Sequence, residues 1–266
     1  MDVQGGFGNQ LFQLFFVINL AKKYGMYIVV PDKKILSTGR SIDVERRTYY
    51  ELFPRCFNLL TETEIKNLNA IPICETDFKY SKVTILDNSL NYVFKGFYQS
   101  PKYFDQNLNI LDYLKLPDID MAKVDEVITN LRSSRKTLVS LHVRRNDYLA
   151  HAYFHCVQSI GYYKKAIEAL REENILVVIF SDDLSWCKEH FEFIKDKVFV
   201  QDKDYIEMMI MSKCDHNIIA NSSFSWWGAY MNTNINKKVV YPSKWFAVNH
   251  VDTSDLFTPD WIKCDE

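Results

Sequence analysis

The sequence predicts an α/β protein of two domains, the second built on a doubly wound parallel sheet. In the second half, short apolar runs alternate with patterns of helical period, which is the order of elements in βαβ units. The apolar runs are residues 138–143, 175–180, 198–200, 217–220 and 239–241, and the helical patterns are residues 162–173, 184–193, 205–214 and 224–231. The first half is less regular and opens with a glycine-rich turn. We expect domains at residues 1–135 and 136–266.

The glycine-rich turn follows a short predicted strand at residues 2–4. Glycines let a backbone come close to a ligand, so Gly6 and Gly8 are candidate binding residues. The side-chain amides of Asn9 and Gln10 come next and can donate hydrogen bonds to such a ligand. The alternative is a tight turn that only starts a packed helix.

An apolar helix follows over residues 11–21 and ends near Gly25, where glycine suits a helix C-terminus. Strand, glycine turn and helix form the layout of a nucleotide-binding loop. A dinucleotide fingerprint, however, needs a third glycine where Leu11 stands. We therefore reject a dinucleotide-dependent oxidoreductase.

The remainder of the first domain gives weaker signals. We expect strands at residues 27–30, 83–86 and 93–97 and helices at residues 62–69, after a Thr61 cap, and 120–132. The aromatic stretch 96–104 would line a sugar subsite or seal the domain core, and the pattern favours the core. Residues 133–136 mark the boundary between the domains.

Composition narrows the class of protein. With 47% hydrophobic and 25% charged residues and a formal charge of -2, the chain has the make-up of a globular protein and no electrostatic reason to bind nucleic acid. Its six cysteines show no metal-ligand spacing, so we expect reduced thiols and a cytoplasmic location. The apolar stretch at residues 11–21 lacks the basic leader of a secretory signal, and no apolar run is long enough to cross a bilayer.

Polar side chains follow the predicted strand at residues 138–143. His142 and Arg144 are two apart and project on the same side of that strand. Ligands of open parallel sheets bind outside the carboxyl ends of the strands, and adjacent arginines there favour an anionic ligand. The alternative is that Arg145 and Asp147 simply pair with each other.

Two further strands end in the same way. Asp182 and Asp183 follow residues 175–180, and the next polar run opens a helix after residues 217–220. In that run, Asn221, Ser222, Ser223 and Ser225 would cap the helix or, with its free amide groups, form a phosphate seat. One diphosphate between Arg144 and this turn would account for all three strand ends.

Two Asp-x-Asp patterns, at residues 118–120 and 202–204, raise the question of a divalent metal. Neither follows a buried strand next to the other motifs, so we expect solvated acids at loops or helix starts. An arginine and helix-end amides can neutralise a diphosphate without a cation.

Five motifs together resemble the bacterial α-1,2-fucosyltransferases. They are GGFGNQLFQ at residues 5–13, GFYQSPKYF at 96–104, HVRRNDY at 142–148, FSDD at 180–183 and HNIIANSSFSWWGA at 216–229, with SKWF at 243–246. The glycine turn and the strand-end arginine also resemble protein O-fucosyltransferases and α-1,6-fucosyltransferases, which share the donor GDP-fucose. In the resembling proteins the strand before the glycine turn is longer than four residues, so we expect chain ahead of Met1.

The resemblance implies a GT-B glycosyltransferase with two Rossmann-like domains facing a cleft. The reaction would be metal-independent and inverting, from GDP-β-L-fucose to the 2-hydroxyl of a terminal galactose. By the same resemblance, Arg144 would grip the β-phosphate and His142 would lie beside the nucleotide. Asp182 or Asp183 would contact the nucleoside, and Ser222, Ser223 and Ser225 the phosphates. The guanine-reading acid falls at Glu207, where an Asp is expected.

Catalysis would depend on charge stabilisation and on a base. Arg144 would stabilise negative charge on the leaving diphosphate. Asp147 would take the proton of the acceptor hydroxyl, or would only hold Arg145 in place. Asn9 would position the acceptor or a phosphate.

The partners that follow are GDP-fucose and a galactose-terminated oligosaccharide or glycolipid, with no resident cofactor, no nucleic acid and no particular oligomeric state predicted. A glycolipid acceptor would bring the protein to the inner face of the membrane. The alternatives are a fucosyltransferase of other linkage or acceptor and a non-catalytic protein that binds nucleotide sugars or glycans.

Overall fold

A computed structural model describes residues 1, 3–32, 35–36, 46–54, 56–105 and 109–265. The chain divides into two compact units. Unit 1 comprises Met1–Lys115 and Val251–Phe257, and unit 2 comprises Leu116–His250 and Thr258–Glu266. The predicted boundary at residues 133–136 is therefore too late. The helix before it, α3 (Asp118–Arg132), belongs to unit 2 because Asp120 binds Lys203 Nζ and the hydroxyl of Tyr205 there.

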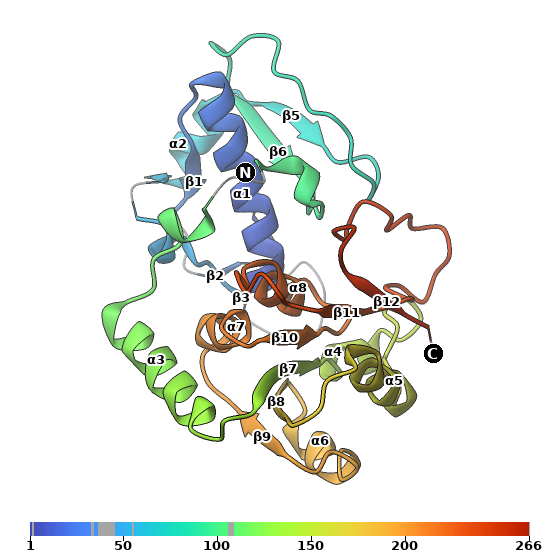
Figure 1. Ribbon diagram of the computed structural model, residues 1–266. Coiled ribbons are helices and arrows are strands. Elements are labelled where there is room, and N and C mark those ends of the chain that lie inside the picture. Colours follow the sequence, from blue (N-terminus) through green and yellow to red (C-terminus); the bar gives the residue numbers. More distant parts are fainter. Residues whose placement is uncertain (2, 33–34, 37–45, 55, 106–108, 266) are drawn as a thin grey trace. The chain divides into compact units, whose positions relative to one another are not determined.

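Unit 1 is organised around α1 (Phe7–Tyr24), the long blue helix of Figure 1. Nearly every side chain of its first four turns is buried, and the helix ends at Gly25, whose φ of 66° lies in the left-handed region. The aromatic stretch 96–104 packs against it: Tyr98 stacks on Phe16 with ring centroids 3.8 Å apart, and Tyr103 is buried beside them. This stretch forms core, as the pattern favoured.

The strands of unit 1 form pairs among its described residues. β1 (Val29–Pro31) runs parallel to β4 (Asn58–Leu60), β5 (Ile71–Cys74) runs parallel to β6 (Tyr92–Lys95), and β2 (Ile35–Leu36) is antiparallel to β3 (Arg46–Arg47). Helix α2 (Glu62–Asn67) begins at Thr61 with a capping box. Short 3₁₀ helices occur at η1 (Tyr50–Leu52), η2 (Pro101–Tyr103) and η3 (Ile110–Asp112).

Two predicted strands of this unit are wrong. Residues 83–86 form no strand, because no described neighbour pairs with them. Residues 3–4 form none either, and Asp2 lies outside the described residues. There the side chain of Gln13 replaces a strand partner: its Nε2 donates to the carbonyl of Gln4 at 2.8 Å, and its Oε1 accepts from the amide of Gln4 at 2.9 Å.

Unit 2 contains a six-stranded parallel sheet in the order β12-β11-β10-β7-β8-β9. The strands are β7 (Thr137–Val143), β8 (Ile175–Ser181), β9 (Lys197–Val200), β10 (His216–Ile218), β11 (Val239–Pro242) and β12 (Ile262–Cys264). When the strands are renumbered 1 to 6 in chain order from β7, the sheet reads 3-2-1-4-5-6 starting at β9. This is the strand order of a Rossmann fold. Every predicted strand of the second half is confirmed, and only β12 was not predicted.

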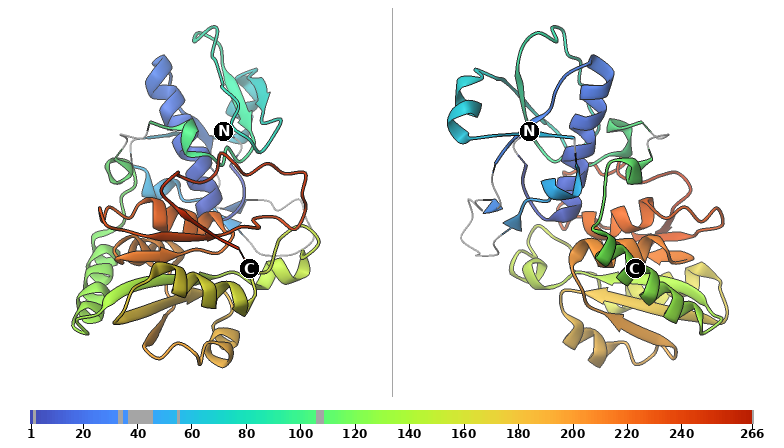
Figure 2. Two further views of the ribbon diagram at one scale, coloured as in Figure 1. Left: turned by 45° about the vertical axis from the view of Figure 1, so that its right-hand side comes forward. Right: turned by 90° about the vertical axis from the view of Figure 1, so that its left-hand side faces the viewer.

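Helices cover both faces of this sheet (Figure 1 and Figure 2). α5 (Ile160–Leu170) and α6 (Leu184–His190) share a buried apolar cluster with Val139, Leu141 and Val143 of β7. α7 (Asp204–Ser212) and α8 (Ser223–Tyr230) lie on the other face, where the ring of His142 meets Phe224 of α8. A five-residue helix, α4 (Asn146–Ala150), follows β7 directly and was not predicted.

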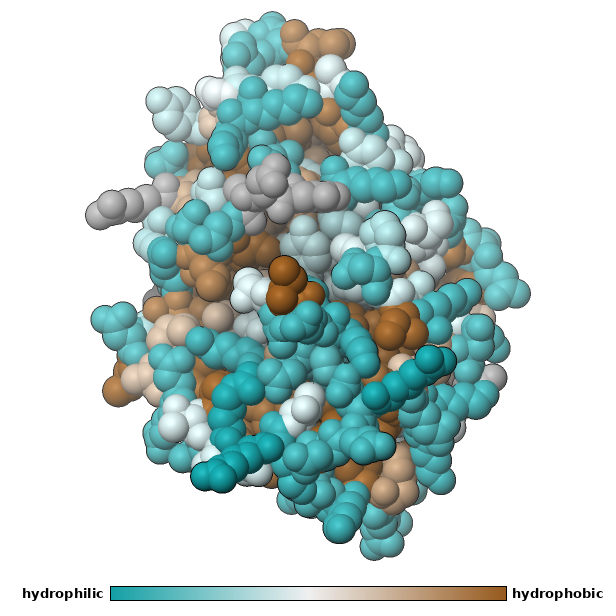
Figure 3. Space-filling model, in the orientation of Figure 1, coloured by the Kyte–Doolittle hydropathy of each residue, from teal (hydrophilic) through white to brown (hydrophobic). Residues whose placement is uncertain are grey.

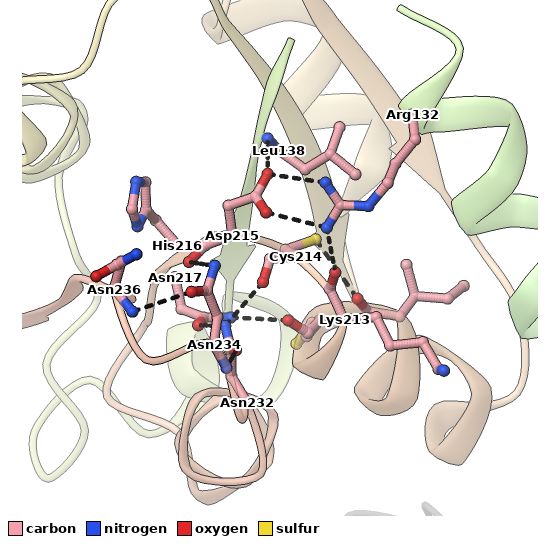
Figure 4. A network of polar contacts seen from close by, with 12 residues as sticks. Arg132, Leu138, Lys213, Cys214, Asp215, His216, Asn217, Asn232, Asn234 and Asn236 are labelled. Atoms are coloured by element: carbon pink, nitrogen blue, oxygen red, sulfur yellow. Dashed lines mark hydrogen bonds and ion pairs between the residues drawn. The ribbon is translucent and has the colours of Figure 1, made fainter. Parts of the chain in front are cut away.

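A buried polar network fixes α7 and α8 near the amino ends of the strands (Figure 4). The side chain of Asn217 donates to Ser140 Oγ at 2.7 Å and to the carbonyl of Met211 at 2.9 Å, and it accepts from Asn232 at 2.8 Å. Beside it, Asp215 accepts a bidentate pair of hydrogen bonds from Arg132. Since buried polar groups are costly when unpaired, this network fixes the register of the two helices on the sheet.

The face drawn in Figure 3 is largely hydrophilic, with hydrophobic residues in small separate groups. Within the described part of the chain, no helix combines the length and apolar character needed to cross a bilayer. All six cysteines are free thiols, as the sequence predicted.

Candidate functional site

The candidate site lies where the order of the sheet of unit 2 reverses. β7 has β8 on one side and β10 on the other, and both pairings are parallel. The chain leaves β7 for β8 over one face and reaches β10 over the other, so the two connections diverge at the carboxyl ends of β7 and β10. Open α/β sheets bind ligands at this switch point. All three polar strand ends predicted from the sequence meet at this edge.

Arg144 lies one residue past the end of β7 and is held by two carboxylates. Its Nη2 is 2.8 Å from Asp147 Oδ2, and its Nε is 3.3 Å from Asp182 Oδ2. Burial opposes the charge of the guanidinium, but these carboxylates outweigh it and raise the pKa of Arg144. Arg144 is thus a fixed cation at the switch point, with about a quarter of its side chain exposed (23%).

The neighbouring Arg145 has a different role. Its guanidinium stacks over the ring of Trp186 in α6 at 3.8 Å, and its Nε is 3.2 Å from Asp183 Oδ2. The alternative of a pair between Arg145 and Asp147 is therefore wrong: Asp147 pairs with Arg144, because the side chain of Arg145 packs on α6. Of the two adjacent arginines, Arg144 is the one available to an anion.

Asp182 and Asp183 both organise the loop. Asp182 accepts the backbone amides of Arg145 at 2.9 Å and of Asn146 at 3.2 Å, and burial raises the pKa of its carboxyl. Asp183 caps α6 by accepting from the amide of Trp186 at 3.1 Å. Both carboxylates thus already accept hydrogen bonds from the backbone. A nucleoside contact for either residue stays a prediction.

The start of α8 provides the second half of the site. Ser222 caps the helix by accepting from the amide of Phe224 at 3.3 Å, and Ser223 begins it. Ser225 is buried and its hydroxyl is directed to the carbonyls of Ala220 and Ser222. Phosphate contacts for these serines stay predictions. The geometry favours the amide groups of the first turn, with Ser223, over the inward-facing hydroxyl of Ser225.

Asn221 acts as a support for this turn. Its side-chain amide donates to the carbonyls of Cys156 at 2.8 Å and Trp245 at 2.7 Å, and its Oδ1 accepts from Gln158 at 3.1 Å. The residue is 1% exposed, so it fixes the path of the chain into α8. A ligand contact for Asn221 stays a prediction.

Tyr148 connects the two halves and was missed by sequence reasoning. Its hydroxyl donates to the carbonyl of Asn221 at 2.8 Å, and its ring lies 5.6 Å from the guanidinium carbon of Arg144. Arg144 and the α8 turn are thereby on the same side of the sheet. The signal was present as the last letter of HVRRNDY, five residues past the end of β7.

His142 lies beneath this assembly. Its ring is 4% exposed and sits 5.2 Å from the ring of Phe224. Burial, together with the charge of Arg144, lowers the pKa of the imidazole to about 3, so the ring is neutral. Among the described residues, its buried Nδ1 finds no hydrogen-bond partner, which marks a polar atom that a ligand or a water molecule would satisfy.

Glu207 stands in the first turn of α7, the helix that follows β9. Its Oε1 accepts from the amide of Asp202 at 2.9 Å, and burial raises the pKa of its carboxyl to about 7. A carboxyl that titrates near neutrality at this edge of the sheet fits a role in ligand binding. Its contact with guanine stays a prediction.

The remaining candidates belong to unit 1. Gly6 is the N-cap residue of α1 and Gly8 lies in its first turn. The glycine that the turn requires is Gly5, with φ of 80°, because a Cβ there would come within 2.5 Å of Asn9 Nδ2. Asn9 Oδ1 accepts from Gln99 at 2.8 Å, which ties the turn to the 96–104 stretch. The catalytic role of Asn9 stays a prediction.

The two Asp-x-Asp patterns meet each other. Asp120 is buried and binds Lys203 Nζ at 2.9 Å, and Asp202 forms an ion pair with Lys123 at 2.5 Å. The expectation of solvated acids is thus wrong for Asp120, because α3 packs on α7. Within the described residues, no three His, Cys, Asp or Glu side chains gather as a metal site would require.

The fold and the site together define an α/β protein of Rossmann strand order that places a cation and the start of a helix at its switch point. Comparison with known proteins makes the assignment: the model of glycosyl transferase family 11 matches residues 2–265, and the chain belongs to that family. The protein is therefore a glycosyltransferase.

Two relatives from Escherichia coli illustrate the family. The O-antigen biosynthesis glycosyltransferase WbnK is 31% identical over 98% of this chain and 98% of its own length. An α-1,2-colitosyltransferase is 28% identical over 76% of this chain and 74% of its own length. Among solved structures, fucosyltransferase NodZ from Bradyrhizobium aligns with a TM-score of 0.54 and 14% identity over 84% of this chain and 89% of that chain. That likeness shows the fold, which is of the GT-B type; NodZ itself has been co-crystallized with GDP.

Proposed function

We propose that the protein transfers L-fucose from GDP-β-L-fucose to the 2-hydroxyl of a terminal galactose, with inversion and without a metal ion. The observation that carries this proposal is the joining of Arg144 to the start of α8 through Tyr148. One fixed cation and the amide-rich start of one helix, after adjacent strands, suit the two phosphates of a nucleoside diphosphate. The family, the linkage in the name of the colitosyltransferase and the fucosyl donor of NodZ support the choice of sugar and linkage.

In this proposal, the chemistry of unit 2 is electrostatic. Breaking the bond between fucose and GDP places negative charge on the β-phosphate, and Arg144 with the α8 amides stabilises that charge. Because Asp182 also holds Arg144, the guanidinium keeps its position when a phosphate replaces Asp147, and little reorganisation is needed as the charge develops. Such preorganised groups lower the barrier more than they strengthen ground-state binding. They also supply the positive charge that a metal ion would otherwise bring.

The acceptor hydroxyl loses its proton as it attacks, and Asp147 is the proposed base. In the free protein its Oδ2 is paired with Arg144. A β-phosphate that binds Arg144 competes with this pair and releases the carboxylate toward the acceptor. Donor binding therefore precedes activation of the base, which predicts an ordered reaction with GDP-fucose first.

The test is a transfer assay with purified protein and GDP-fucose, using lactose, lacto-N-biose and N-acetyllactosamine as acceptors. The expected result is GDP release that depends on the acceptor, with a product whose NMR spectrum shows an α-fucosyl group on galactose O2. GDP-colitose in a parallel reaction distinguishes the two sugars, and EDTA tests the metal. Binding of GDP without transfer to any of these galactosides would support a nucleotide-sugar-binding protein instead.

The setting of the reaction follows from the acceptor. We propose a cytoplasmic enzyme, which meets the inner face of the membrane when its acceptor is a glycolipid. Fractionation of cells with and without the lipid-linked acceptor tests this: the protein is expected in the membrane fraction only when that acceptor is present.

A further inference from the structure

The segment that follows Asp147 exposes two large apolar side chains beside the candidate site. Leu149 in α4 is 50% exposed, and Tyr153 is 75% exposed. A single exposed apolar residue is ordinary on any protein surface. Two within five residues, directly after the residues that position Arg144, form a local surface that the donor site does not use.

This segment is firmly anchored from behind. The ring of His155 stacks on Tyr148 with centroids 4.1 Å apart and planes 10° apart. Phe154 packs on Phe246 at 5.0 Å, and its carbonyl accepts from the amide of Ala247 at 2.9 Å. Tyr153 is therefore exposed on a chain segment whose neighbours are fixed. An exposed aromatic ring on an anchored backbone loses less freedom when a ligand covers it than one on a loose segment would.

A hydrogen-bonding group lies next to the aromatic ring. His151 Nδ1 is 3.1 Å from the backbone carbonyl of Asp147. A carbonyl oxygen only accepts, so Nδ1 carries the hydrogen, and in the neutral ring Nε2 is left as an acceptor. The ring of His151 lies 6.0 Å from that of Tyr153. An apolar ring face and a hydrogen-bond acceptor thus stand together, joined to the backbone of the proposed base.

We propose that residues 149–153 form a binding subsite for a sugar of the acceptor, with Tyr153 as its platform. A pyranose ring has one face of C–H groups, which stacks on an aromatic side chain, and hydroxyls at its rim, which donate to an acceptor such as His151 Nε2. Leu149, four residues before Tyr153 in the chain, is the second exposed apolar side chain of this segment. This inference rests on the proposed function and adds to it an acceptor contact within unit 2.

The experiment compares Tyr153→Ala and Tyr153→Phe with the wild-type protein in steady-state transfer to lactose. Tyr153→Ala is expected to raise the acceptor KM by about three- to tenfold, the loss of one stacked ring. The KM for GDP-fucose and the slow hydrolysis of GDP-fucose without acceptor are expected to stay unchanged. Tyr153→Phe keeps the ring and is expected to keep the acceptor KM. Ile235→Ala is the matched control: this side chain is 95% exposed, in the turn before β11.

A binding measurement keeps the inference testable if the transfer reaction differs from the proposed one. Saturation-transfer NMR of lactose with GDP-loaded protein is expected to show contact that is lost in Tyr153→Ala and kept in Ile235→Ala. If the wild type transfers fucose and Tyr153→Ala leaves both the acceptor KM and lactose contact unchanged, the subsite is wrong while the function stands. If lactose contact depends on Tyr153 but no fucose is transferred, the function fails and the subsite stands. A Tyr153-dependent change in oligomeric state, with saccharide contact unaffected, would overturn the subsite in favour of self-association.

Discussion

The hydroxyl of Tyr148 donates to the backbone carbonyl of Asn221 at 2.8 Å, across 73 residues of sequence. One hydrogen bond thereby joins the loop after β7 to the turn that starts α8. Because the ring of Tyr148 also lies against Arg144, the same side chain fixes the distance between the cation and the helix amides.

Replacing that hydroxyl is expected to weaken donor binding. Tyr148→Phe keeps the ring against Arg144 and His155 but removes the hydrogen bond. A single such bond contributes about 0.5–1.5 kcal/mol, so we expect the Kd for GDP to rise by about two- to tenfold. Isothermal titration with GDP measures this, and an unchanged Kd would show that the link is not needed for the donor seat.

The two arginines are expected to fail in different ways. Arg144→Ala should lower kcat by about two to three decades, as for other single oxyanion-stabilising groups, while Tm changes little. Arg145→Ala should lower Tm more, since it removes the stack on Trp186 and the pair with Asp183. Thermal unfolding and kinetics on both variants separate the roles. Full activity in Arg144→Ala would refute its assignment.

Asp147→Asn gives opposite signs for binding and turnover. Removing the charge frees Arg144 from a partner that competes with phosphate. A partly exposed pair is worth about 0.2–1 kcal/mol, so GDP affinity should rise by up to about fivefold. Transfer should fall to near background, because the base is lost. Asp183→Asn is the control, because the partner of Asp183 is Arg145, and it should show no gain in GDP affinity. Weaker GDP binding with normal turnover in Asp147→Asn would exclude Asp147 as the base.

The carboxyl of Glu207 predicts pH dependence. Burial raises its pKa from 4.5 to about 7 in the folded protein. The stability that it contributes is therefore fully present below pH 4.5 and is lost as the pH rises through about 7. If ionised Glu207 accepts from guanine N–H groups, GDP affinity should instead increase over the same rise. Chemical denaturation and GDP binding, each measured at about pH 6 and about pH 8, report the change in stability and the change in affinity. Glu207→Gln should abolish both changes. A pH-independent Kd for GDP in the wild type would exclude the guanine contact.

The network around Asn217 predicts a stability effect at a distance from the site. Asn217→Ala leaves Ser140 and Asn232 without a shared partner in a buried setting, and each unsatisfied group costs about 1–3 kcal/mol. Chemical denaturation should therefore show a loss of at least about 1 kcal/mol. Asn236→Ala is the control at the exposed end of the same chain segment (Figure 4) and should be near neutral. Equal stability of the two variants would contradict the structural role of the network.

The second domain could be predicted well because its signals are local. The apolar runs at β7 and β8 are long, their flanks are polar, and parallel strands require helices between them. Strand β12 is three residues long and carries the charged Lys263, so no pattern marks it. In unit 1 the side chain of Gln13 substitutes for a strand, which no periodicity reveals.

At the site, the sequence indicated which residue types would gather but not which role each residue would have. That Arg144 and the α8 turn share one edge followed from strand polarity alone. Which arginine would lie at the switch point and which would pack on α6 depended on Trp186, forty-one residues from Arg145 in the sequence. The supporting role of Asn221 depended on carbonyls of Cys156 and Trp245, contacts that only the folded chain defines.

The return of Val251–Phe257 to unit 1 has a consequence for engineering. The chain passes between the units after Lys115, again after His250 and a third time after Phe257. Asp255 there accepts from the amide of Tyr80 at 3.2 Å, and its carbonyl accepts from Ser100 Oγ at 2.6 Å. A chimaera that exchanges the first unit for that of a relative must therefore carry two separate pieces of sequence. A single splice at residue 115 would leave the original Val251–Phe257 segment against the unit 1 of another protein.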